Sequence, residues 1–232
     1  MRLFFGILIG LLLAIGIAVA AGYYAFDGMG DISERNKEND ITQTVEVSDF
    51  EHIDVVGVFE LDVTVGGDYS VVISGAPSEM ERLEVSVENG SLRLDRKDNN
   101  RHGFGRWRDM GLTAEITMPA LRSIDLAGVA DGDVRGVDSE SFDVDLSGVG
   151  DLNISGSCGR LNADVSGVGD LNARELECRV VDVDVSGVGE ASVYASEEVD
   201  ASVNGIGSIT IYGSPSNVDK STSTFLSSIS VK

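Results

Sequence analysis

The feature that most constrains the fold is a short repeat in the second half of the 232-residue chain. The motif Ser-Gly-Val-Gly, or a close variant, recurs so that its first glycines are 20, 19, 20 and 18 residues apart: Gly128, Gly148, Gly167, Gly187 and Gly205. On both sides of each motif apolar and polar residues alternate, which is typical of a strand with one buried and one solvated face. Each copy therefore predicts two short strands joined by a glycine corner, followed by a looser return.

The copies must stack, because a unit of about 20 residues cannot bury its own apolar face. A nearly constant period predicts a parallel β-solenoid, also called a β-helix, in which each coil adds ~4.8 Å along the axis. An antiparallel sandwich also has many short strands, but it gives no reason for the same corner to recur. In the stack we expect the residues between the corner glycines to form an inward-pointing ladder: Val129, Val149, Val168, Val188 and Ile206.

The first half of the chain alternates in the same way, so the predicted fold class is all-β. Examples are Leu61-Asp-Val-Thr-Val65 and Ser91-Leu-Arg-Leu-Asp95. The Asn89-Gly90 pair is a hairpin signal, and residues 77–83 predict one helical turn or a loop.

The N-terminus points to export. Residues 3–26 contain no charged side chain, and such a stretch is either a secretory signal peptide or a transmembrane anchor helix. We therefore expect a leader at 1–26, a polar linker at 27–43 and the solenoid domain at 44–232. The protein is then expected in the periplasm or at the cell surface, held to the membrane by its N-terminus if the leader is not cleaved.

The strong negative charge restricts the partners. The chain has 39 acidic against 17 basic residues, a formal net charge of −22, which argues against binding nucleic acid. Within the repeat, Asp145, Asp164 and Asp184 occupy one position of successive copies. A stack brings them together, either as a solvated acidic face or as Ca²⁺ ligands, because hard cations take several carboxylate oxygens. No other cofactor is indicated.

One segment has the opposite charge. Residues 93–108 hold six basic side chains against two acidic ones and include the single tryptophan of the chain. Arginine beside tryptophan suits the binding of an anion, a sugar or an acidic protein face. The alternative is a solvated loop with local aromatic packing. The candidate binding residues are Arg101, Arg106, Trp107 and Arg108, in a loop that we expect to project from the stack.

The two cysteines are expected to form a disulfide. Cys158 and Cys178 each precede the opening residue of equivalent strands by four positions, so they lie one coil apart at the same position of the repeat. The spacing of neighbouring strands is within the Cα separation that a disulfide accepts. The alternative is a pair of buried thiols.

Taken in order, several segments resemble the bacterial head GIN domain family, which is labelled as autotransporter adhesins. The resemblance covers about residues 44–231 and rests on Phe50-Glu-His-Ile-Asp-Val, Gly67-Asp-Tyr-Ser-Val-Val-Ile, Met118-Pro-Ala-Leu-Arg-Ser-Ile-Asp-Leu-Ala-Gly128 and the Ser-Gly-Val-Gly repeats. It implies an exported β-helical domain with an adhesive or surface-structural role, and it brings no catalytic residues.

We therefore expect a non-enzymatic, envelope-associated adhesion or interaction module that binds an envelope component, a glycan or a protein surface. Two alternatives stay open: an extracytoplasmic enzyme acting on polysaccharide, and an anchored envelope-sensing domain. The sequence contains no nucleophile elbow, phosphate loop or zinc pattern, and a uniform acidic ladder does not supply two carboxylates in different environments.

Overall fold

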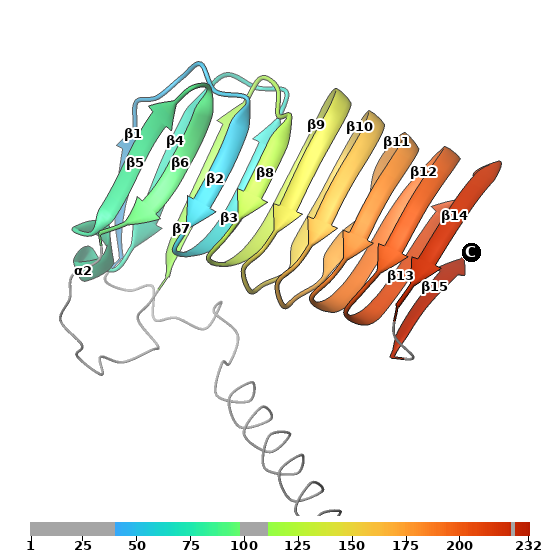
Figure 1. Cartoon of the computed structure of the whole chain (residues 1–232). Helices are drawn as coiled ribbons and strands as arrows, with labels where there is room; N and C mark the ends of the chain where they lie inside the picture. The colour runs from blue at the N-terminus through green and yellow to red at the C-terminus, as the bar shows by residue number, and fades with distance from the viewer. Residues whose placement is uncertain (1–39, 98–110, 224–225) are drawn as a thin grey trace, which may run out of the picture. The chain divides into compact units, whose positions relative to one another are not determined.

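The computed structural model describes residues 40–97, 111–223 and 226–232. These residues belong to one compact unit, Lys37–Lys232, and they form a β-solenoid of stacked strands (Figure 1). The elements before residue 98 are β1 (Ile41–Val45), β2 (His52–Val56), β3 (Val58–Val65), β4 (Ser70–Gly75), α2 (Pro77–Met80), β5 (Leu83–Glu88) and β6 (Ser91–Arg96). Those after residue 110 are β7 (Leu112–Met118), β8 (Ser123–Leu126), β9 (Val129–Leu146), β10 (Leu152–Val165), β11 (Leu171–Val185), β12 (Val188–Val203), β13 (Ile206–Gly213), β14 (Asn217–Thr222) and β15 (Ser227–Val231).

The predicted parallel stacking is confirmed. Strands β9, β10, β11 and β12 pair in parallel, with Ala163 of β10 facing Val144 of β9 and Val183 of β11. The return that we expected to be loose is itself strand, because each of these elements runs for 14–18 residues. Each strand bends partway, for example at Gly136, whose φ is +79°, and so contributes to two sheets.

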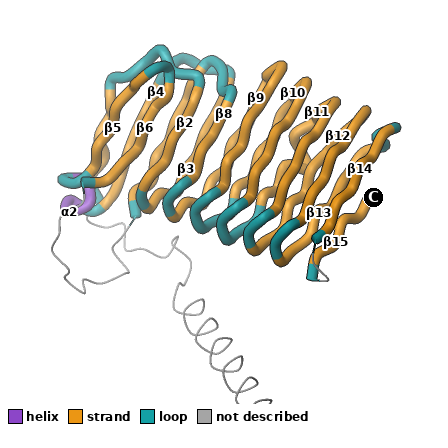
Figure 2. Tube along the Cα trace, in the orientation of Figure 1, coloured by secondary structure: helices purple, strands orange, loops and turns teal. Residues whose placement is uncertain are grey.

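The two sheets have different outer surfaces, which we name by their residues. The tyrosine face is the outer surface of β3, the first halves of β9–β12, β13 and β15, and it carries Tyr194 and Tyr212. The aspartate face is the outer surface of β6, β2, β8, the second halves of β9–β12 and β14, and it carries Asp145 and Asp164. The glycine corners between the sheets lie along one edge of the stack, and loops between the N-terminal strands also lie at the opposite edge (Figure 2).

The core lies between the two sheets and follows from the alternation. Inward residues such as Leu146, Leu161 and Val185 are completely buried, whereas their neighbours in sequence are exposed or half-buried. Phe50, Phe59 and Phe142 are the largest buried side chains, so one continuous apolar column fills the solenoid.

The N-terminal end departs from the regular repeat. Strands β1, β4 and β7 pair antiparallel, as do β5 and β6, and the β5–β6 hairpin turns at Asn89 and Gly90, both with positive φ. Of the two outcomes expected for residues 77–83, a helical turn or a loop, the structure forms the helical turn α2. Strand β1 begins at Ile41, earlier than the boundary expected at 44, because residues 41–45 add their backbone hydrogen bonds to β4.

Candidate functional site

The glycine corners have a backbone-to-backbone geometry that explains the repeat. At each corner the amide of the central residue donates to the carbonyl of the first glycine one coil earlier, as in Val149 N to Gly128 O at 2.9 Å and Val168 N to Gly148 O at 3.0 Å. A Cβ on Gly167 would lie 1.9 Å from the Gly148 carbonyl oxygen. The second glycine of the motif is restricted in the same way, since a Cβ on Gly169 would lie 1.9 Å from Gly150 O. Only glycine therefore allows the coils to approach this closely.

The predicted inward ladder is wrong in its direction. The residues between the glycines do stack in parallel register, but they point outward. Val149, Val168, Val188 and Ile206 are 37%, 41%, 47% and 51% exposed. The physical reason is space, because Leu146 and Leu152 already fill the inside of the corner and are completely buried. A tight corner has no room for a third inward side chain.

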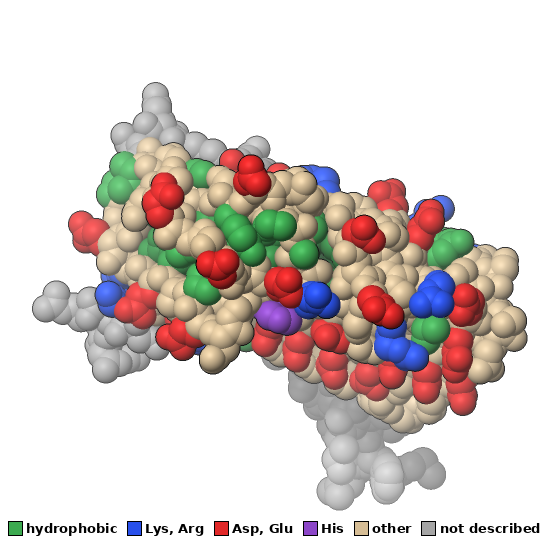
Figure 3. All heavy atoms as spheres, turned by 90° about the horizontal axis from the view of Figure 1, so that it is seen from above, with side chains coloured by type: hydrophobic (Ala, Val, Ile, Leu, Met, Phe, Trp, Pro, Cys, Tyr) green, Lys and Arg blue, Asp and Glu red, His purple; other side chains and the backbone are tan. Residues whose placement is uncertain are grey.

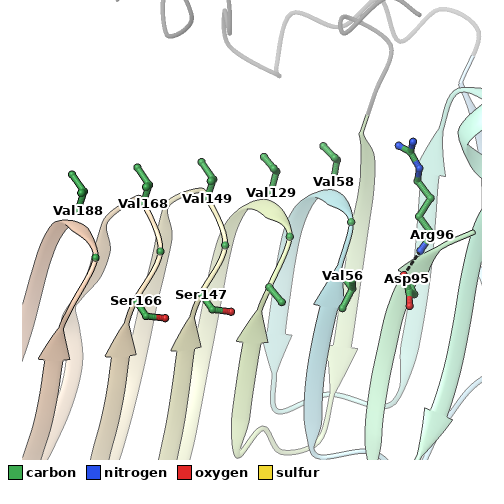
Figure 4. A pocket seen from close by; sticks show the side chains of 16 residues that line it. Val56, Val58, Asp95, Arg96, Val129, Ser147, Val149, Ser166, Val168 and Val188 are labelled. Atoms are coloured by element: carbon green, nitrogen blue, oxygen red, sulfur yellow. Dashed lines mark hydrogen bonds between the residues drawn. The ribbon is translucent and has the colours of Figure 1, made fainter. Parts of the chain in front are cut away.

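The outward residues form one wall of a shallow groove of about 790 Å³ along the corner edge. Figure 4 shows Val58, Val129, Val149, Val168 and Val188 in a single row, with Ser147 and Ser166 turned the other way. We call these five side chains the valine row. Glycine backbone forms much of the remaining surface, so a ligand could approach the main chain closely along the whole edge.

One end of the groove is charged. Arg96 rises beside the valine row (Figure 4), and its guanidinium donates to Glu79 Oε2 at 3.1 Å. Glu79 is 7% exposed, and Arg82 lies 3.8 Å from its other oxygen. The buried carboxylate therefore orients Arg96, since breaking such a buried pair leaves an uncompensated charge.

A column of acidic residues beside the corners stabilises the stack. The carboxylate of one coil accepts a hydrogen bond from the main chain of the next: Asp151 N to Asp131 Oδ1 at 3.0 Å, Asp170 N to Asp151 Oδ1 at 3.0 Å, and Glu190 N to Asp170 Oδ1 at 2.7 Å. These acids bind backbone amides across coils, and this role explains why an acid follows the second glycine in several copies.

The candidate Ca²⁺ ligands lie in single file on the aspartate face. Asp145 pairs in register with Asp164, and Asp164 pairs with Asp184. Figure 3 shows a row of acidic side chains along this edge of the body. Residues in a line do not converge on one point, and no group of three or more His, Cys, Asp or Glu within residues 40–97, 111–223 and 226–232 is arranged to hold a metal ion.

Crowding changes the acidity of this ladder. Partial burial raises the pKa of Asp164, and the charges of Asp145 and Asp184 raise it further, while a hydrogen bond from Ser166 acts in the opposite direction. The pKa of Asp125 is raised for the same reasons, burial first. One oxygen of Asp125 is buried and has no hydrogen-bond partner among the described residues, which is a further cost of its ionised form.

The two ends of the ladder have different partners. Arg93 pairs with Asp54 and Asp95 at the N-terminal end, and these two acids raise the pKa of the Arg93 guanidinium. At the other end the side-chain amide of Asn204 donates to Asp184 Oδ2 at 3.1 Å. Within the described ranges, none of Asp145, Asp164 and Asp184 forms an ion pair.

The structure joins the two cysteines in a disulfide between neighbouring coils. Cys158 of β10 and Cys178 of β11 are register partners with a Cα separation of 4.5 Å. Both side chains are buried. The bond thus links two coils at the bend between the tyrosine and aspartate faces.

Two sets of predicted residues lie outside the described part of the chain. These are the leader and most of the linker, and the loop with Arg101, Arg106, Trp107 and Arg108. The residues that flank this loop on its N-terminal side are described: Arg96 contacts Glu79, and Lys97 pairs with Glu84 at 3.0 Å. In the residues that the structure does describe, no helix has the length and apolar character needed to cross a bilayer.

Comparison with known proteins assigns a family. The sequence profile described as "Putative auto-transporter adhesin, head GIN domain" matches residues 49–215. A crystal structure of a putative adhesin from Bacteroides fragilis is similar, with a TM-score of 0.69 and 27% identity, over 83% of this chain and 97% of that one. A putative lipid binding protein from Parabacteroides distasonis shares the fold, with a TM-score of 0.50 and 20% identity, over 84% and 97% of the two chains. No curated protein matches the sequence.

Proposed function

The chain belongs to the head GIN domain family, and from this premise we propose that it is an exported, envelope-associated β-solenoid that acts as an adhesion or interaction module. The description of the family and that of the B. fragilis protein support an adhesin-like role. We propose that the module works by binding alone. The partner is then a component of the envelope or a ligand on another surface.

The observation that carries the proposal is the outward direction of the valine row. Aliphatic side chains at a repeated position would normally supply the core, yet here the core is complete without them. A regular line of exposed apolar groups above a glycine and serine surface is typical of a contact site. Its period is that of the coils, ~4.8 Å, so an extended partner can engage several coils at once.

The exposed area of each valine limits the free energy of binding that a partner can gain by covering it. Full burial of a valine contributes about 1.5–3 kcal/mol, and Val149, Val168 and Val188 are 37–47% exposed. Each therefore contributes about 0.6–1.4 kcal/mol when a partner covers it. A single groove then supports weak binding, and firm attachment comes from many copies acting together on one surface.

A direct test replaces the apolar groups without touching the core. We expect Val149→Ser, Val168→Ser and Val188→Ser together to abolish binding of the purified full-length protein to the component that the groove recognises, identified on an array of envelope components and glycans. The matched control removes three exposed apolar side chains elsewhere, Ile41→Ser, Leu226→Ser and Val231→Ser, which are 44–54% exposed. Equal binding by the groove variant and the wild type, with unchanged thermal midpoints, would refute the assignment of the groove.

We also propose that the basic loop contributes charge to the same activity. The loop follows Arg96, which lines the groove. Replacing Arg101, Arg106 and Arg108 by Ser should weaken binding and remove its dependence on salt, because contacts between exposed charges are screened. Binding measured at two salt concentrations tests this. Unchanged affinity and salt dependence in the triple variant would assign the binding to the solenoid alone.

A further inference from the structure

The tyrosine face contains a strip whose chemistry differs from the rest of the surface. Its outward residues lie in two columns along β10, β11, β12, β13 and β15. One column is Asn153, Asn172, Ser192, Thr210 and Ser230. Two residues further along each strand, on the same outward face, lie Ser155, Arg174, Tyr194, Tyr212 and Lys232. Tyr194 and Tyr212 are register partners, whereas the register is irregular at β11, where Ser155 pairs with Glu175 and Tyr194 pairs with Glu177. We call these ten residues the tyrosine strip.

None of these ten side chains is a carboxylate, although the chain has a net charge of −22. Carboxylates border the strip: Glu175 and Glu177 lie at the irregular register of β11, and Asp151, Asp170 and Glu190 lie two residues before the first column. The corresponding positions of the aspartate face on β9–β12 and β14 are dominated by aspartate: Asp143, Asn162, Asp182, Asp200 and Asp219 in one column, and Asp145, Asp164, Asp184, Ser202 and Ser221 in the other. The two faces come from the same repeat, so the contrast is local to this strip.

Two cations converge on one ring within the strip. The Arg174 guanidinium lies 4.5 Å from the centre of the Tyr212 ring, and the Lys232 ammonium lies 5.8 Å from it. Neither forms an ion pair with another residue in the described ranges. By contrast, Arg135 at the start of the same face is neutralised by Asp62 and Asp133. Arg174 and Lys232 thus keep their charge available for a ligand.

We propose that the tyrosine strip is a second binding surface, which takes an acidic glycan. Arg174 and Lys232 would bind a carboxylate or sulfate of the sugar, held in place by their contacts with Tyr212. The exposed rows of amides and hydroxyls, spaced by ~4.8 Å, would exchange hydrogen bonds with successive hydroxyl groups of the same chain.

The geometry favours a glycan over a peptide. The strip lies on the face of a paired sheet, where the ladder uses the backbone amides and carbonyls, so a peptide cannot add itself as a strand. The strip presents hydroxyls, amides and two phenol groups in place of apolar pockets for peptide side chains. Hydroxyl-rich, charged sugars match this surface, and its position on the sheet makes it separate from the valine row at the corners.

The test measures binding of an oligogalacturonate by the full-length protein, with a neutral malto-oligosaccharide and a poly-glutamate peptide as comparison ligands. Arg174→Gln should weaken oligogalacturonate binding about tenfold, as expected for one charge-assisted contact, and Tyr212→Ser should also weaken it. Arg160→Gln is the matched control, because it removes an exposed arginine of β10 outside the strip. It should leave the affinity unchanged, as should the triple serine variant of the valine row.

Several results would overturn the proposal. These are an absence of oligogalacturonate binding, equal losses in the Arg174 and Arg160 variants, and equal binding of the neutral sugar. Poly-glutamate binding that is as tight as oligogalacturonate binding would show that the strip takes acidic chains of any kind. Unchanged thermal midpoints of the variants establish that any loss is local.

Discussion

Replacing Gly167 by Ala tests the idea that backbone contact between coils dictates the repeat. The new Cβ would lie 1.9 Å from Gly148 O and 2.9 Å from the carbonyl carbons of Gly148 and Ser147. All three are backbone atoms, so no side chain can rotate away. Gly167 does not have a positive φ, hence alanine could adopt its conformation. The penalty is therefore steric, and it should appear as separation of two coils.

The expected size of the loss follows from the hydrogen bonds at this corner. Separation weakens Gly167 N to Leu146 O and Val168 N to Gly148 O, both 3.0 Å long, and each bond contributes about 1 kcal/mol. Overpacking strain adds about 1–3 kcal/mol. We therefore expect a loss of about 3–5 kcal/mol in the free energy of unfolding.

Urea denaturation followed by circular dichroism measures this loss, with Ser147→Ala as the control in an exposed corner position. The control should change stability by less than about 0.5 kcal/mol. If Gly167→Ala loses less than about 1 kcal/mol, the close approach of the coils does not explain the glycine, and the reasoning fails.

Three further outcomes follow from the structure. Val168→Ala should lower the free energy of unfolding by less than about 1 kcal/mol, because the side chain is 41% exposed. Val165→Ala should lower it by about 2–4 kcal/mol, because Val165 is completely buried. Equal losses in urea titrations would contradict the outward direction of Val168. The exported protein, denatured without reductant, should show no reactive thiol, and reduction of Cys158–Cys178 should cost about 3 kcal/mol; two titratable thiols would exclude the bond. The raised pKa of Asp164 means that the folded state binds a proton at this carboxylate more tightly than the unfolded state does. The contribution of Asp164 to the stability of the folded state therefore falls as pH rises from about 3.8 through the raised pKa. Asp164→Asn should therefore be more stable than wild type at pH 7 and show a flatter dependence of the thermal midpoint on pH; identical pH profiles would disprove this.

The repeat pattern predicted the stacked strands of the solenoid more fully than the surfaces that they present. Period-two alternation and a constant spacing were enough to predict parallel stacking, the register and the alignment of Cys158 with Cys178. The same alignment already contained the tyrosine strip, because Tyr194 and Tyr212 are one coil apart. The tyrosines occur in two copies alone, so the residues that the copies share do not mark this position.

The direction of the valine row follows from the same alternation, which the expected inward ladder did not carry through the corner. Val165 and Leu171 are buried on either side of the corner, and counting in twos from either of them places Val168 on the outward side. The glycines occupy the inward positions between them, where the neighbouring coil leaves no space for a Cβ.

The sequence by itself thus determined the stacking of the coils, because one chain repeats one pattern of burial. The tertiary structure decided which side chains from different segments come into contact. It brought Arg174 and Lys232 to one ring, and it placed Arg96 against the buried Glu79. These are properties of volume and of distances between coils, and a linear pattern of polarity does not contain them.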